Sequence, residues 1–266
     1  FAAGHIENAL EQAIIANTLA DDPAAMLNEQ EITDLVLAAE RTIVEAEREH
    51  DWLYVLSLYR QLRMLHDSPA LYHHEAMRSA RHLRLLRMYA PKELDRLYDL
   101  RAQRLDEEPD PEDRPRDDEP WQDQLDGVNV SIFNRSGQYA AGKHVGSGGY
   151  VPLMRGAVDA MLVLADTKGL EETFPSMRDF NRVDSFRRGM LTMKRELTGE
   201  HVKLGDFDVE KLADRILAAN TRSIGLPEAV IVLEMTDGAM GMLDDFSSVI
   251  WPSETEHFAR NTQGKF

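Results

Sequence analysis

The stretch WLYVLSLYRQLRML, residues 52–65, is apolar on nearly every side of the helix that its spacing indicates. Large apolar side chains stand at Trp52, Leu53, Val55, Leu56, Leu58, Tyr59, Leu62 and Leu65. A helix of this kind is covered by neighbours on several sides. The flanking sequence is therefore expected to supply further helices that bury it.

Helical patterns fill the sequence on both sides of this stretch. Apolar residues recur at helical spacing, and Asn28 is the expected N-cap of the helix that precedes it. Pro69 and Pro91 are expected near the first positions of two later helices. Residues 1–105 are thus predicted to form a helical bundle or helical array, with short connections and antiparallel neighbours.

The overall composition indicates a globular protein without a membrane span, disulfides or thiolate sites. Hydrophobic residues make up 43% and charged residues 29% of the 266 residues, which is typical of a globular protein. No run of about 18 apolar residues is present, so we expect a soluble protein without a membrane span. There is no cysteine, which excludes disulfides and thiolate sites. This fits a reducing compartment such as the cytoplasm, an organelle matrix or a virion.

The net charge of −17 is unevenly distributed along the chain. Residues 60–104 carry 10 basic and 5 acidic side chains, whereas residues 105–126 carry 2 basic and 11 acidic ones. Overall acidity argues against nucleic-acid binding. Residues 78–104 form the one segment whose basic side chains suit such a partner. Within that segment, the side chains predicted to form a solvated face or to contact a partner are Arg78, Arg81, Arg84 and Arg87.

Residues 106–126, DEEPDPEDRPRDDEPWQDQLD, are predicted to be an acidic, proline-rich linker. Its prolines break helices, and its acidic side chains repel one another. Trp121 is a large apolar residue within this polar tract. We expect it to dock on one of the domains or on a partner.

Residues 127–266 are predicted to form a smaller α+β unit with few strands. The apolar run at residues 128–133 and the β-branched run at residues 229–233 have the composition of short strands. A third strand is expected at residues 246–251. The predicted fold class is therefore mainly α, with a helical N-terminal domain and this α+β unit.

The stretch GQYAAGKH, residues 137–144, resembles a phosphate-binding loop in part. Gly137, Gly142 and Lys143 match the spacing G-x-x-x-x-G-K, but His144 stands where a magnesium-binding hydroxyl is required. The favoured interpretation is a mobile glycine-rich loop over residues 137–151 that contacts a protein neighbour. Its further glycines are Gly146, Gly148 and Gly149.

Two other segments resemble parts of von Willebrand factor A domains. Residues 232–238, VLEMTDG, are similar to the late strand and T-D-G turn of that family. Residues 132–138, IFNRSGQ, are similar to its first strand and metal-binding turn, although Asn134 and Gln138 depart from the ligand pattern. The resemblance implies strands at both places.

No catalytic or metal-binding constellation is predicted from the remaining residues. The histidines at positions 66, 73, 74 and 82 lack the i, i+4 spacing of helical zinc sites. We therefore expect no cofactor and a non-catalytic structural or assembly subunit of a larger protein complex, such as a virion. A nucleotide-binding enzyme or switch, and a degenerate von Willebrand factor A-like module, remain as alternatives.

Overall fold

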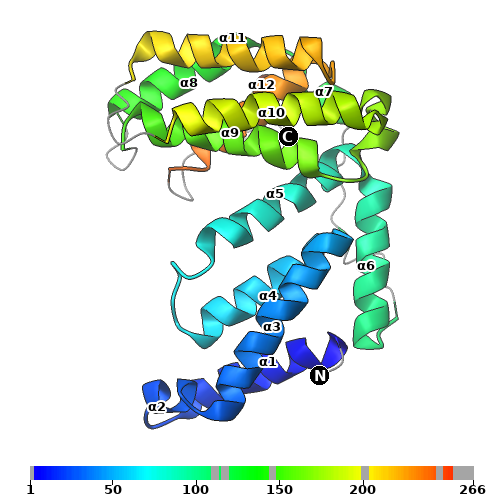
Figure 1. Ribbon diagram of the computed structural model, residues 1–266, viewed down its shortest axis with the longest axis vertical. Coiled ribbons are helices and arrows are strands. Elements are labelled where there is room, and N and C mark those ends of the chain that lie inside the picture. The colour runs from blue at the N-terminus through cyan, green and yellow to red at the C-terminus, as the bar shows by residue number, and fades with distance from the viewer. Residues whose placement is uncertain are drawn as a thin grey trace, which may run out of the picture. The chain divides into compact units, whose positions relative to one another are not determined.

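The computed structural model describes residues 3–108, 114, 120–143, 148–198, 204–243 and 248–253 (Figure 1). Within these residues the chain forms twelve α-helices, two short 3-10 helices and no strand. The predicted mainly α class is confirmed, whereas the α+β character predicted for the C-terminal unit is not shown. The chain divides into two compact units, Phe1–Arg116 and Asp117–Phe266, here called unit 1 and unit 2.

Unit 1 is built around the helix that the apolar stretch predicts. Its helices are α1 (Ala3–Leu19), α2 (Pro23–Leu27), α3 (Gln30–Glu49), α4 (Trp52–Leu65), α5 (His73–Tyr89) and α6 (Pro91–Leu105). Helices α1, α3, α5 and α6 all pack against α4. Val55, Leu58 and Leu62 of α4 are completely buried, which confirms that this helix has neighbours on several sides.

Two of the expected helix starts are displaced. Asn28 closes α2, and Glu29 is the N-cap of α3. Helix α5 begins at His73 and not near Pro69, because Tyr72 takes a left-handed conformation, with φ 53°, that separates the proline from the helix. The hydroxyl of Tyr72 donates a hydrogen bond to Glu40 of α3, which holds this turn against its neighbour.

Unit 2 is a bundle around a second buried helix. Its elements are α7 (Trp121–Gln124), α8 (Val130–Lys143), α9 (Tyr150–Asp166), η1 (Leu170–Glu172), η2 (Pro175–Arg178), α10 (Phe180–Glu196), α11 (Asp206–Arg222) and α12 (Glu228–Met240). Helices α8, α9 and α11 pack against α12. Ten of the 13 residues of α12 are buried, so this helix forms the centre of the unit.

The strand predicted at residues 229–233 is wrong, because these residues lie in α12. A short apolar run does not by itself distinguish a buried strand from a buried helix. Here helices surround the run, and tertiary packing overrides the weak β preference of Val230, Ile231 and Val232. Of the strand predicted at residues 246–251, the described residues 248–251 are not in a strand, and the others lie outside the described residues.

The strand predicted at residues 128–133 is also wrong, because α8 begins at Val130. Asn129 provides the start signal, since its side-chain oxygen accepts a hydrogen bond from the backbone N–H of Ser131 at 3.1 Å. Gly137 lies on the buried face of α8, where a Cβ would stand 3.3 Å from Cγ1 of Val209. This glycine therefore allows α8 to pack closely on α11.

Helices α9 and α12 pack tightly against each other at a pair of glycines. A Cβ built on Gly156 of α9 would collide with the carbonyl oxygen of Gly238 in α12 and with Cγ of Met242. Only glycine fits at position 156 without moving the backbone of the central helix. In the part of the chain that the structure describes, no helix is both long and apolar enough to cross a membrane.

Candidate functional site

Helix α10 lies beside α9 and α11 and turns one side away from the core of unit 2 (Figure 1). Its first turn is capped by Asp179, whose carboxylate accepts a hydrogen bond from the N–H of Asn181 at 2.9 Å. Its inner side buries Phe186, Met190 and Met193. The helix is therefore fixed in orientation by its packing, and its outer side is held in a defined position.

The outer side of α10 combines cationic and apolar side chains, and we call it the α10 face. Phe180 is 78% exposed and Leu191 is 41% exposed, although both are large and apolar. They are eleven residues apart, which places them on one side of the helix about three turns apart. The cations of the α10 face are Arg187, Arg188, Lys194 and Arg195.

An open hollow lies on this face, and three of the four cations contribute to its lining. Its lining consists of Arg188, Leu191, Thr192, Lys194, Arg195 and Thr198, and contains no acidic side chain. Arg188 and Lys194 are each paired with an aspartate beside the hollow, so the lining is weakly positive in a protein whose net charge is −17. The hollow therefore favours an anionic ligand group next to an apolar one.

Three cations of the α10 face already hold carboxylates of their own unit. The ion pairs are Arg187–Asp166 at 3.3 Å, Arg188–Asp184 at 3.0 Å and Lys194–Asp159 at 2.6 Å. All of these side chains are substantially exposed, and exposed pairs contribute only about 0–1 kcal/mol. A carboxylate from a partner can therefore replace these acids at small cost.

Arg195 differs from the other cations because it is held by neutral groups. Its Nε donates to the carbonyl of Leu191 at 3.4 Å, and its Nη2 donates to Oγ1 of Thr192 at 3.2 Å. Among the described residues, no carboxylate forms an ion pair with Arg195. Its guanidinium is the cation on this face with the most to gain from an added carboxylate.

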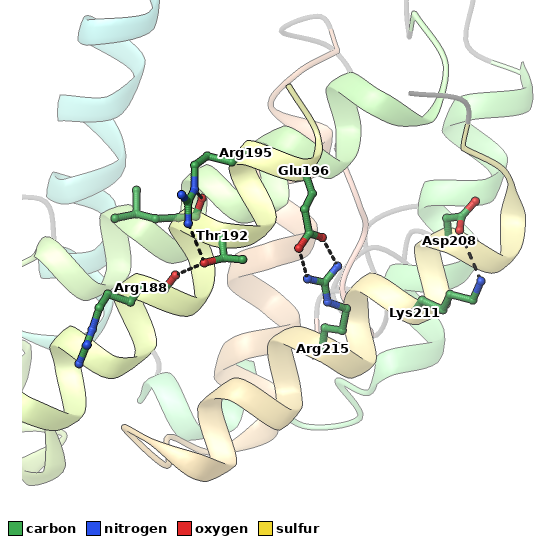
Figure 2. Close-up of polar contacts among 8 residues, drawn as sticks. Arg188, Thr192, Arg195, Glu196, Asp208, Lys211 and Arg215 are labelled. Carbon is green, nitrogen blue, oxygen red and sulfur yellow. Dashed lines mark hydrogen bonds and ion pairs between the residues drawn. The ribbon is translucent and has the colours of Figure 1, made fainter. Parts of the chain in front are cut away.

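An ion pair between α10 and α11 stiffens the C-terminal end of the face. Figure 2 shows Glu196 and Arg215 pointing toward each other, and they form two hydrogen bonds of 2.7 Å and 3.0 Å. These bonds lower the pKa of Glu196 and keep it ionised. Because Glu196 is turned toward α11, it is occupied by Arg215 and does not close the hollow.

Unit 1 contains a second polar group of residues, which is buried and structural. We call it the Arg104 cluster: Glu7 of α1, the N-cap Asp51 with Tyr54 and Ser57 of α4, and Arg104 of α6. The guanidinium of Arg104 pairs with Asp51, lies 3.9 Å from Glu7 and stacks 3.6 Å above the ring of Tyr54. Burial and the nearby charge of Glu7 raise the pKa of Tyr54 to about 12. The cluster joins three helices and is closed to a ligand.

A buried histidine lies elsewhere in unit 1. The imidazole of His82 is fully buried and stacks on the indole of Trp52, with ring centres 3.7 Å apart and planes nearly parallel. Burial, followed by the charges of Arg78 and His50, lowers the pKa of His82 from 6.5 to about 3. The ring is therefore neutral at pH 7 and serves as a core aromatic group.

This pKa predicts a specific loss of stability in acid. The unfolded chain binds a proton at His82 below pH 6.5, whereas the folded chain does so only near pH 3. Between these values the free energy of unfolding falls by about 1.4 kcal/mol per pH unit on account of this residue. In urea unfolding, the free energy of unfolding of His82→Phe should depend on pH less steeply than that of wild type, by this amount per pH unit. Equal slopes for His82→Phe and wild type would contradict the assignment.

The structure brings the predicted phosphate-loop residues together on one helix. Gly137, Gly142 and Lys143 all lie in α8, so the strand and loop that a phosphate site requires are absent there. Gly148 and Gly149 precede α9 with φ of 62° and 84°, conformations that favour glycine. Gly146 and His144 lie outside the described residues. The nucleotide hypothesis thus loses its structural premise.

The other predicted contact residues lie on different elements. Trp121 is half-buried and meets Phe174 edge to face at 5.5 Å, so it packs within unit 2. On α5, Arg78 and Arg87 are exposed, whereas Arg81 and Arg84 are half-buried. Arg81, Arg84 and Arg87 each have an interaction of their own. These arginines therefore do not form a single exposed surface.

The folds implied by the remaining sequence hypotheses are not found. Residues 132–138 and 232–238 lie in α8 and α12, so the strands implied by the resemblance to von Willebrand factor A domains are wrong. Within the described ranges, no group of three or more histidine or acidic side chains is placed to hold a metal ion. No family model matches the chain, and no curated protein or solved structure is significantly similar to it.

Sequence reasoning missed both the α10 face and the Arg104 cluster. A sequence signal for the α10 face was present. Arg187 and Lys194 are seven residues apart on one helix, and so are Arg188 and Arg195. No local signal marks the second, because Glu7, Asp51 and Arg104 meet only through the packing of α1, α4 and α6.

Proposed function

We propose that this chain is a non-catalytic assembly subunit of a larger protein complex and acts through helical protein–protein surfaces. The observation that carries this proposal is the α10 face, on which Phe180 and Leu191 are exposed among four cations. Aromatic residues and arginine are enriched in the energetically important parts of protein interfaces. A partner that covers this face gains apolar burial and charge-assisted hydrogen bonds together.

The rigidity of the surface supports the same function. The inner side of α10 is anchored by Phe186 and Met190, both completely buried, and its end is tied to α11 by Arg215. The central helix α12 holds α9 in place behind it. A surface fixed before binding loses little conformational entropy when a partner docks.

The proposal predicts that the chain is found in stoichiometric complexes. We expect native mass spectrometry of the tagged chain, isolated from the cells that produce it, to show assemblies heavier than the single chain. The double variant Leu191→Asp/Arg195→Glu should release the partner that contacts α10, because it removes apolar contact and reverses a charge. The control Lys211→Glu alters an exposed cation of α11 and should keep the assembly. A wild-type chain that is monomeric in these cells would contradict the proposal.

A further inference from the structure

We infer that the α10 face binds an acidic amphipathic helix of a protein partner. The inference rests on the proposed function and adds to it the site and the chemistry of the partner. It depends on the spacing of side chains along α10, on the ion pairs that they form and on the position of the apolar residues of this helix.

The side chains of the α10 face form two cationic rows on either side of an apolar line through Phe180 and Leu191. Asp184, which pairs with Arg188, lies close to this line. At 100° per residue, Arg187 and Lys194 lie on one side of Leu191, and Arg188 and Arg195 lie on the other. Each row repeats after seven residues, about 10.5 Å along the helix. A partner helix with apolar residues on one face and acidic residues seven apart at both edges matches this pattern.

The apolar line sets the length of the partner. Phe180 and Leu191 are separated by eleven residues, which corresponds to about 16.5 Å. A helix that covers both side chains needs at least three turns. Both side chains are large and exposed, so covering them adds hydrophobic stabilisation to the charge contacts.

The ion pairs on the face favour carboxylates over phosphates as the bound groups. Arg187, Arg188 and Lys194 each carry an acid of this chain, so the local field is only weakly positive. Nucleic-acid binding depends on cations that are free to neutralise many phosphates, and the chain as a whole carries a net charge of −17. A carboxylate of the partner can replace a carboxylate of this chain in these ion pairs, and a further one can bind Arg195. Neither contact requires a strong positive field.

The distribution of apolar residues on α10 argues against a lipid surface. A helix that lies on a membrane turns its large apolar face toward the lipid. In α10 this face, with Phe186, Met190 and Met193, is turned into the core of unit 2. The outer side retains Phe180 and Leu191, which is enough for contact with a partner helix but gives no broad apolar face.

A display library of helical 16-residue peptides tests the inference on the full-length chain. We expect the enriched peptides to be acidic, with carboxylates seven residues apart around an apolar residue. A synthetic enriched peptide should bind in fluorescence anisotropy at least ten times more tightly than the same peptide with glutamine in place of its acids. The double variant Arg188→Ala/Arg195→Ala should weaken binding at least tenfold. The control Lys211→Ala/Arg222→Ala removes two cations of α11 and should bind as wild type does.

Several results would overturn the inference. Enriched peptides that are neutral or basic, or whose binding survives Arg188→Ala/Arg195→Ala, would exclude the proposed partner. No enrichment above the background of an unrelated protein would do the same. Stronger binding of a DNA oligonucleotide or of phosphatidylserine vesicles, lost in the same variant, would assign the face to nucleic acid or lipid. Such results overturn only the assignment of the α10 face to an acidic helix. The proposed assembly function stands if the wild-type chain still forms stoichiometric complexes in cells.

Discussion

Gly156→Ala is expected to destabilise unit 2 by about 3 kcal/mol or more, the upper range for overpacking a core. The new methyl group would meet the carbonyl oxygen of Gly238, which belongs to the backbone of α12 and cannot turn aside as a flexible side chain does. Relief requires that α9 and α12 separate, which loosens the contact around which unit 2 is built. Urea unfolding followed by circular dichroism measures the change.

The same substitution at a second helical glycine provides the control. Nothing lies within 4 Å of a Cβ built on Gly142 of α8. Gly142→Ala should therefore leave stability unchanged or raise it by up to about 1 kcal/mol, since alanine favours the helix. If Gly156→Ala were as stable as Gly142→Ala, the close contact between α9 and α12 would be wrong.

Arg104→Met is expected to cost unit 1 about 3–5 kcal/mol, as is typical when one member of a buried ion pair is removed. Glu7 is 7% exposed and Asp51 is 5% exposed, so the substitution leaves two buried carboxylates without the cation that they share. The stacking of the guanidinium on Tyr54 is lost as well. Thermal and urea unfolding report the loss.

Two further variants separate this effect from a general loss of charge. Arg96 forms an exposed ion pair with Glu93 on the same helix, and Arg96→Met should cost about 1 kcal/mol or less. Adding Glu7→Gln and Asp51→Asn to Arg104→Met removes the buried charges and should restore part of the lost stability. Equal costs for Arg104→Met and Arg96→Met, or no recovery in the triple variant, would show that the cluster is not a buried ionic contact.

The helices of unit 1 could be predicted because their signals are local. The apolar stretch of α4, the proline that opens α6 and the spacing of apolar residues all act within one or two turns. Two helix starts differ from the prediction, because Tyr72 and Asn28 take conformations that the local spacing does not specify. The mainly α character of the chain therefore followed from the sequence, whereas some helix boundaries did not.

The strands of unit 2 were predicted incorrectly because β-branched residues in a short run fit both a strand and a buried helix. At residues 229–233 the helix is favoured over the strand by packing against α8, α9 and α11. These helices surround the run and are distant in sequence. Likewise, the glycines of residues 137–143 suggested a loop, but Gly137 lies in α8, where a Cβ would stand 3.3 Å from Cγ1 of Val209 in α11. A glycine placed for close packing and one placed for a turn look alike in a single sequence.

The candidate site was hidden for a different reason. Apolar spacing marks α10 as a helix, but does not show that Phe180 points outward while Phe186 points inward. The basic segment was placed at residues 78–104, where Arg104 is in fact drawn into a buried cluster. The exposure of the charged side chains, and not their number, distinguishes a binding surface from a structural ion pair.

The most direct test of the proposed assembly function is the native mass of the chain in the cells that produce it, measured for wild type and for Leu191→Asp/Arg195→Glu. A photo-crosslinking amino acid at position 191 identifies whether the neighbour lies on the α10 face. The account predicts a stoichiometric complex for wild type, a crosslink to its partner chain at position 191 and release of that partner in the double variant. A wild-type chain that remains monomeric, with no crosslink at this position, would contradict it.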